Sequence, residues 1–268
     1  MRRRRRVALA IAGGVVAAWL VALMVVDIAA ADRVADGVAG RLGDSLQGSA
    51  RFGDRDLALV RGRLDLERLE VRRADAVGTL ALDVAGVRCE LAPFGAALFS
   101  RDCSELAVRG MRLEVSTVAL FKLRPPKRRP IHADVVTIDD AVFAFPANAI
   151  VQGLGEVRVT LDRAVAGPTT FKTPMSWVFA LRGLHARIAL PANQAVEVTY
   201  AHGMLQASGS LLGDPPIAIP VELPVTTPED DGRAELAKLG RFGRDLAERL
   251  LARRAEQWLQ KKLFGQPR

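Results

Sequence analysis

An uncharged apolar stretch near the N-terminus, Val7 to Val26, constrains this chain more than any other feature. As a helix with a rise of roughly 1.5 Å per residue, its 20 positions would reach about 30 Å, the thickness of the hydrocarbon layer of a bilayer. Five arginines, Arg2 to Arg6, precede the stretch directly, and Asp27 follows it. Because positively charged residues are retained in the cytoplasm, the pattern predicts a cytoplasmic N-terminus and an extracytoplasmic remainder.

A cleaved signal peptide is the alternative for this stretch. The alanines at 29–31 offer the small residues that a signal peptidase needs, but the apolar part of a signal peptide is usually only about 7 to 15 residues long. We therefore favour an uncleaved anchor at residues 1–27, with Val7, Trp19 and Val26 in the membrane. In both cases the rest of the chain works outside the cytoplasm.

The composition excludes one class of partner and favours a thin fold. Without the five leading arginines, 33 basic residues face 30 acidic ones, and the formal charge falls from +8 to +3. We therefore expect no nucleic-acid partner. Ten Phe, three Trp and one Tyr are few rings for 268 residues, so the core should consist mainly of Val, Leu and Ala. This composition favours an elongated β structure over a thick globule.

Two cysteines, Cys89 and Cys103, lie in a part of the chain that is expected to fold where disulfides form. A bond between them would close a 13-residue loop and contribute roughly 3 kcal/mol in the chain-entropy model. The alternative is two buried free thiols. A metal site is not expected, because no histidine lies near either cysteine.

The periodicity of apolar residues changes after the anchor. Steps of three and four predict a juxtamembrane helix at 28–47, and from Asp56 apolar and polar residues alternate as in half-buried strands. The runs at 64–71 and 80–91 slip by one residue in their middle. A β-bulge or tight turn would keep the apolar set on one face and bend the strand, so the pattern predicts a curved sheet.

The remaining chain continues this pattern and ends in a helix. Residues 122–130 are rich in Lys, Arg and Pro and indicate an exposed linker, a possible subdivision or a contact with lipid headgroups. Asp139-Asp140 is interpreted as the turn of a hairpin. We expect an antiparallel β domain at 48–227 and an amphipathic helix at 228–268, which either packs over the open end of the sheet or lies on a membrane surface.

No catalytic motif is recognisable. The three histidines, His132, His185 and His202, have no metal-ligand spacing, and phosphate-binding and nucleophile-elbow motifs are absent. Asp139-Asp140 is better explained as turn residues than as a pair of catalytic carboxylates. We expect a protein without enzymatic activity, metal or cofactor.

The alternating strands predict one continuous aliphatic face with a polar reverse. Helices and a second layer would cover such a face in an ordinary domain, whereas an open face would form a groove for acyl chains, which require only apolar area. Periodicity alone does not decide between these two arrangements. The candidate lining residues are Leu64, Leu66, Leu80, Leu82, Val84, Val157, Val159, Leu161, Val196, Val198 and Tyr200.

The layout resembles the AsmA-like family of envelope proteins, which belongs with bridge-type lipid transfer proteins. The similarity is carried by the arginine-led anchor, the helix that follows from Asp27, and two strand segments. These segments are Arg-Gly-Arg-Leu-Asp-Leu-Glu-Arg-Leu-Glu-Val at 61–71 and Met-Arg-Leu-Glu-Val-Ser at 111–116. The expected hairpin at 136–143 is also similar, although it has Asp140 and Ala141 where the family often has a glycine.

The resemblance implies a curved β groove, a single-pass inner-membrane anchor, a periplasmic bulk, and a role in phospholipid transport or outer-membrane maintenance. The chain departs from the family in its length, since its few short strands do not reach across the periplasm. It would instead cradle one lipid, pass lipid to a partner, or serve as a scaffold. The layout is also similar to small mycobacterial-type phospholipid-binding proteins. The competing hypothesis is a non-catalytic assembly factor that binds another envelope protein.

Overall fold

The computed structural model describes residues 32–33, 35–37, 39–40, 43, 48–58, 62–75, 78–91, 102–116, 131–146, 155–173, 175–191, 194–209, 212 and 216–264. The expected anchor and the basic segment 122–130 lie outside these ranges. Described residues between Asp32 and Gly43 are helical, whereas the rest of the expected helix at 28–47 is not described. Within the described ranges, no helix combines the length and apolarity needed to cross a membrane.

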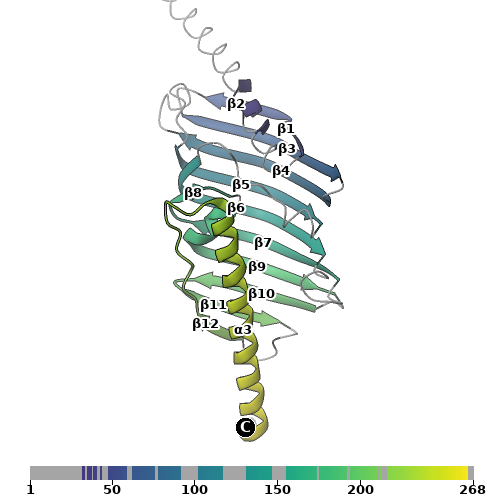
Figure 1. The fold of residues 1–268 in the computed structure, drawn as a ribbon, viewed down its shortest axis with the longest axis vertical. Coiled ribbons are helices and arrows are strands. Elements are labelled where there is room, and N and C mark those ends of the chain that lie inside the picture. Colours follow the sequence, from purple (N-terminus) through teal and green to yellow (C-terminus); the bar gives the residue numbers. More distant parts are fainter. Residues whose placement is uncertain are drawn as a thin grey trace, which may run out of the picture.

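A curved, unclosed sheet dominates the molecule (Figure 1). Its path runs β1-β3-β4-β5-β6-β7-β9-β10-β11-β12, with β2 beside β3 and β8 beside β6. A 3₁₀ helix, η2 (Ser176–Ala180), precedes β9, and helix α3 (Gly232–Phe264) ends the described chain. The twelve described strands are β1 (Ser49–Arg51), β2 (Asp54–Ala58), β3 (Arg63–Asp75), β4 (Gly78–Leu91), β5 (Asp102–Val115), β6 (Ile131–Pro146), β7 (Glu156–Ala166), β8 (Thr169–Phe171), β9 (Leu181–Leu190), β10 (Gln194–Ala201), β11 (Met204–Gly209) and β12 (Ile217–Pro220).

The sheet is mixed, so the expectation of a purely antiparallel sheet was wrong. Strands β5 and β6 are parallel, and the other described pairs are antiparallel. A parallel pair needs a connection of about a dozen residues or more, and 116–130 supplies 15. The basic stretch 122–130, predicted to be an exposed linker and a possible subdivision, therefore falls between two neighbouring strands of one sheet.

The prediction of a hairpin turn at Asp139-Asp140 was also wrong. Strand β6 runs without a break from Ile131 to Pro146. Asp140 lies in its middle with a φ of 54°, a left-handed conformation that is uncommon for residues other than glycine. After Ile138 the apolar residues move from even to odd positions in the sequence. This change therefore marks an irregularity inside one strand and not the end of a strand.

Similar irregularities align across five neighbouring strands. In each strand one residue has no direct cross-strand partner, although its neighbours on both sides are paired. For example, Glu67 pairs with Gly86 and Leu69 with Val84, whereas Arg68 and Ala85 between them do not pair. The irregularity ends between β7 and β9, where the register shifts by one residue and all residues of β9 at this point are paired. We call this line the slip row; its members are Arg68, Ala85, Gly110, Asp140 and Asp162.

The slip row explains the broken alternation in the sequence. Arg68, Gly110 and Asp140 have φ values of 53°, 59° and 54°, which reverse the alternation of the chain at these points. The apolar side chains that follow thereby return to the face used by those that precede, as Leu66 and Leu69 illustrate, both buried. The expected irregularity within the runs at 64–71 and 80–91 is thus confirmed.

Substitution of Gly110 by alanine should test the strain at this row. A Cβ atom at Gly110 would lie 2.8 Å from the Cβ of Ala85, and the left-handed φ adds about 1–2 kcal/mol for a residue with a side chain. We expect a loss of roughly 2 kcal/mol in the free energy of unfolding, measured by urea denaturation. The matched control is Gly86→Ala, because a Cβ there meets nothing within 4 Å. Equal stability of the two variants would contradict the strained geometry.

Candidate functional site

The apolar face of the sheet is continuous from strand to strand. Starting at Leu69 on β3, each residue is the direct cross-strand partner of the next, and the line reaches Ile217 on β12. We call this line the apolar track. Its nine members are Leu69, Val84, Met111, Ala141, Leu161, Ala186, Val198, Ala207 and Ile217. No polar side chain interrupts it over nine strands.

The residues expected to line a groove lie on or beside this track, and none is exposed. Most are buried: Leu64, Leu66, Leu80, Val84, Val157, Leu161 and Tyr200. The others, Leu82, Val159, Val196 and Val198, are half-buried. Sequence periodicity therefore identified the face. It missed Arg73, which lies opposite Leu80 on the same face and is 5 % exposed.

The buried side chains on this face form two clusters. The smaller one contains Leu69, Val71, Leu80, Val84 and Val115, and none of its described members belongs to α3. The larger one extends from Leu64 on β3 to β12 and is joined by Phe242, Leu246 and Leu250 of α3. Helix α3 thus contributes to the core on the β12 side of the sheet, in agreement with Figure 1, where it crosses in front of β6 to β12.

The start of α3 is held by a buried carboxylate. Asp231 accepts a hydrogen bond from the N–H of Ala234 (2.8 Å), as a helix-capping residue does. One turn further, Glu235 is only 1 % exposed and accepts hydrogen bonds through Oε2 from Ser176 (2.6 Å) and Thr173 (3.2 Å). These contacts fix the helix to η2 and the residues before it.

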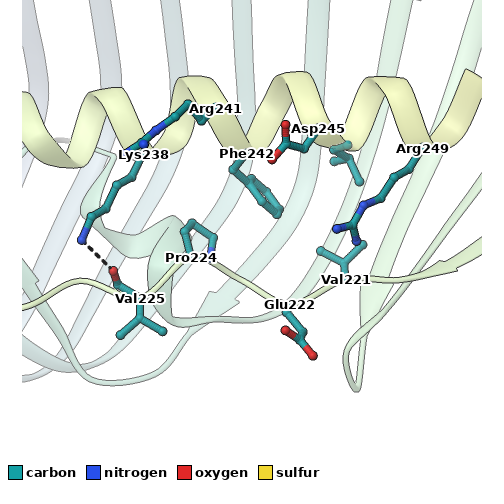
Figure 2. Close-up of a pocket in the computed structure, with 10 residues that line it drawn as sticks. Val221, Glu222, Pro224, Val225, Lys238, Arg241, Phe242, Asp245 and Arg249 are labelled. Carbon is teal, nitrogen blue, oxygen red and sulfur yellow. Dashed lines mark hydrogen bonds between the residues drawn. The ribbon is translucent and has the colours of Figure 1, made fainter.

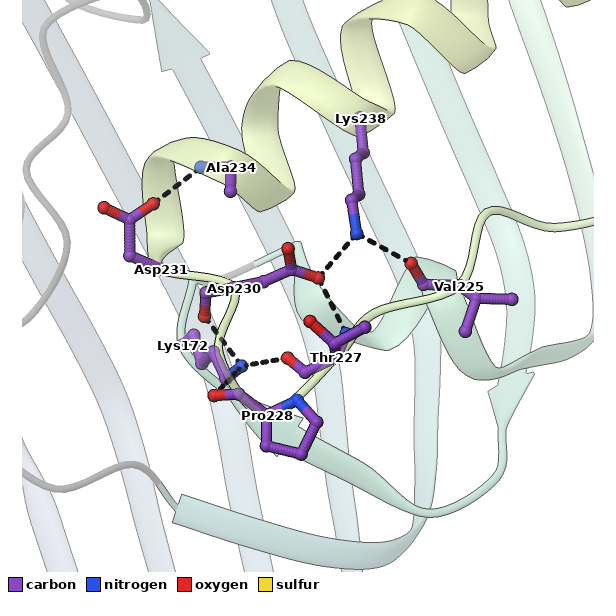
Figure 3. A network of polar contacts seen from close by, with 8 residues as sticks. All are labelled: Lys172, Val225, Thr227, Pro228, Asp230, Asp231, Ala234 and Lys238. Atoms are coloured by element: carbon purple, nitrogen blue, oxygen red, sulfur yellow. Dashed lines mark hydrogen bonds and ion pairs between the residues drawn. The ribbon is translucent and has the colours of Figure 1, made fainter.

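Two lysines fasten the segment that leads into α3 (Figure 3). Lys172 donates to the carbonyl oxygens of Thr227 (2.8 Å), Pro228 (3.2 Å) and Asp230 (2.7 Å). Lys238 donates to Asp230 Oδ2 (2.6 Å) and to the carbonyl of Val225 (3.0 Å). The hydrogen bonds from Lys238 and from the backbone N–H of Thr227 hold the pKa of the Asp230 carboxyl below its usual value. The first half of α3 is therefore a fixed part of the domain.

A cleft of about 460 Å³ lies between α3 and the irregular segment after β12 (Figure 2). Lys238, Phe242 and Arg249 point from the helix towards this segment. Its walls are Val221, Glu222, Pro224 and Val225 on one side, and Lys238, Arg241, Phe242, Asp245, Leu246 and Arg249 on the other. Lys238 is paired with Asp230, and the lining contains two further basic residues, Arg241 and Arg249, and two acidic ones, Glu222 and Asp245.

The opposite face of the sheet carries charged side chains. Arg63 and Arg88 both contact Asp65, at 2.5 and 2.7 Å. Burial acts to raise the pKa of Asp65, but the hydrogen bonds from Arg88 and Arg63 outweigh it and keep the pKa below its usual value. Asp139, once considered as one half of a carboxylate pair, forms an ion pair with Arg163. This face therefore presents a network of paired charges.

The disulfide links two neighbouring strands. Cys89 on β4 and Cys103 on β5 are bonded, with their Cα atoms 5.5 Å apart, and both are buried in the larger cluster. Among the residues that the structure describes, no group of three or more His, Cys, Asp or Glu side chains is placed to hold a metal ion. No protein-family model matches the sequence, and no curated protein matches it.

Proposed function

We propose that this protein is a membrane-anchored periplasmic protein whose sheet binds or shields phospholipid acyl chains, in lipid transport or outer-membrane maintenance. The observation that carries the proposal is the apolar track, which crosses nine strands of an unclosed sheet without a polar side chain. The resemblance to AsmA-like proteins supports the same function.

An acyl chain is the ligand that such a face suits best. It offers no polar group to recognise, and its binding depends on apolar area at roughly 25 cal/mol per Å² buried. Val159, Val196 and Val198 are half-buried on this face, so part of their surface is available for contact with a chain.

The arrangement of the sheet suggests an orientation relative to the membrane. Arg55 on β2 forms ion pairs with Asp32 (3.1 Å) and Asp36 (3.2 Å), so the start of the described chain lies at the β1–β2 end of the sheet. If Val7 to Val26 spans the inner membrane, the apolar track leads away from that membrane towards β12. Ten strands at about 4.8 Å spacing extend roughly 43 Å, which suits holding one lipid or passing it to a partner.

The second candidate is a non-catalytic scaffold that binds another envelope protein. It is favoured by the burial of seven of the eleven candidate lining residues within the chain itself. A scaffold needs no access to the apolar face, whereas a lipid carrier requires it.

Site-specific photocrosslinking in bacterial cells separates the two candidates. A benzophenone amino acid is introduced into the full-length chain at Val198, on the apolar track, and the matched control places it at Glu197, which is exposed on the reverse face. After growth with radiolabelled phosphate, we expect a phospholipid adduct at Val198 and none at Glu197. The absence of an adduct at Val198, or equal labelling at both positions, would reject the lipid hypothesis in favour of the scaffold.

A further inference from the structure

Helix α3 consists of two halves with different surroundings. In the first half, Phe242, Leu246 and Leu250 recur every four residues and pack on the larger cluster. In the second half the large apolar side chains are exposed, and Figure 1 shows this end of the helix projecting past β12. Their exposed fractions are 67 % for Leu251, 52 % for Trp258, 48 % for Leu259 and 72 % for Leu263.

The exposed side chains form a stripe on the opposite side of the helix. At 3.6 residues per turn, Phe242, Leu246 and Leu250 share one side, and the stripe of the second half is centred about 170° away from it. This second stripe is roughly 140° wide, and its apolar members are Leu251, Ala252, Ala255, Trp258, Leu259 and Leu263. Lys262 also falls within this arc, with its ammonium over the Trp258 ring. The stripe is therefore not a continuation of the contact with the sheet, and its large apolar side chains are accessible to a partner.

The charge of the second half indicates the nature of that surface. Between Leu251 and Phe264 there are four basic residues, Arg253, Arg254, Lys261 and Lys262, and one acidic residue, Glu256, which gives a net charge of +3. The ammonium of Lys262 lies 4.7 Å from the centre of the Trp258 ring. A tryptophan next to a lysine on an amphipathic cationic helix suits the boundary between lipid headgroups and acyl chains.

We propose that Leu251 to Phe264 binds the surface of a bilayer rich in anionic phospholipid, with its apolar stripe in the headgroup region. A second copy of the chain fits less well, because pairing these helices would bring two clusters of positive charge together. The proposal rests on α3 alone and is independent of a lipid groove on the sheet.

Vesicle flotation with the full-length chain tests this proposal. The protein is held in phosphatidylcholine nanodiscs, so that its N-terminal segment is already accommodated, and is mixed with separate vesicles. We expect it to float with vesicles that contain phosphatidylglycerol and not with pure phosphatidylcholine vesicles. Replacing Lys261 and Lys262 by glutamine should weaken this binding roughly fivefold per lysine.

A matched pair of neutral substitutions isolates the apolar stripe. Leu259→Ser should weaken binding about tenfold, whereas Gln260→Ser, at the next position but on the polar side, should leave it unchanged. Both positions are exposed, so circular dichroism melting curves should coincide with that of the unaltered protein. Unchanged flotation of Leu259→Ser, or equal flotation with both vesicle types, overturns the proposal. Nanodiscs paired through two chains, and separated by Leu259→Ser, would assign the stripe to a second copy instead.

Discussion

Replacement of Trp177 by alanine is expected to lower the free energy of unfolding by about 3–5 kcal/mol. Trp177 is 6 % exposed in η2 and belongs to the larger cluster, so its removal leaves a large cavity in that cluster. The neighbouring Ser176, which donates to the buried Glu235, would lose its support as well. For a domain of this size, such a loss lowers the melting temperature by roughly 2–4 °C per kcal/mol.

Trp258 provides a control with the same change of side chain. It is 52 % exposed on the projecting half of α3, so Trp258→Ala should cost less than about 1 kcal/mol. Urea denaturation followed by circular dichroism measures both variants. A similar loss in the two variants would show that η2 is not part of the core.

The second large effect is expected from the disulfide. Replacement of both Cys89 and Cys103 by alanine should lower the free energy of unfolding by roughly 3 kcal/mol, mainly because the unfolded chain is no longer restricted by the closed loop. The bond joins the end of β4 to the start of β5, and the backbone pairing of these strands along the rest of their length should preserve the fold.

A reductant supplies the control for this prediction. It should lower the stability of the unaltered protein to that of the Cys89→Ala, Cys103→Ala variant and leave the variant itself unchanged. If urea midpoints of the unaltered protein are the same with and without reductant, the bond contributes nothing and the prediction is wrong.

The strands could be predicted because a sheet with one buried face imposes a period of two on the sequence. The same period identified Leu66, Leu161 and Val198 as members of one face. At Asp140 the sequence did not show whether the break in alternation is a turn between two strands or an irregularity within one strand. Both arrangements place polar residues between apolar runs, and the structure has a left-handed residue within one strand. Only the register with the strands on both sides distinguishes them.

Two further features depended on contacts between distant parts of the chain. The parallel pairing of β5 and β6 could not be predicted, because the composition of 122–130 indicated only an exposed linker. The degree of burial of Leu80 and Tyr200 depends on the curvature of the sheet and on neighbouring elements, which periodicity does not describe. The helix at the C-terminus was predicted correctly, but the division of α3 at Leu250 required the position of the sheet beside it.

The order of the strands also determines how the protein can acquire its structure. From β3 to β12, apart from β8, every strand pairs with the one that comes next in the chain. Contacts between neighbours in sequence have a low loop-closure cost, so a chain that emerges N-terminus first can add its strands one at a time. The pairing of β5 with β6 has a higher loop-closure cost than the others, because the two strands are parallel. The chain must first return over residues 116–130 to the starting end of β5. Assembly should therefore pause at this point, with β1 to β5 already formed and the free edge of β5 uncovered.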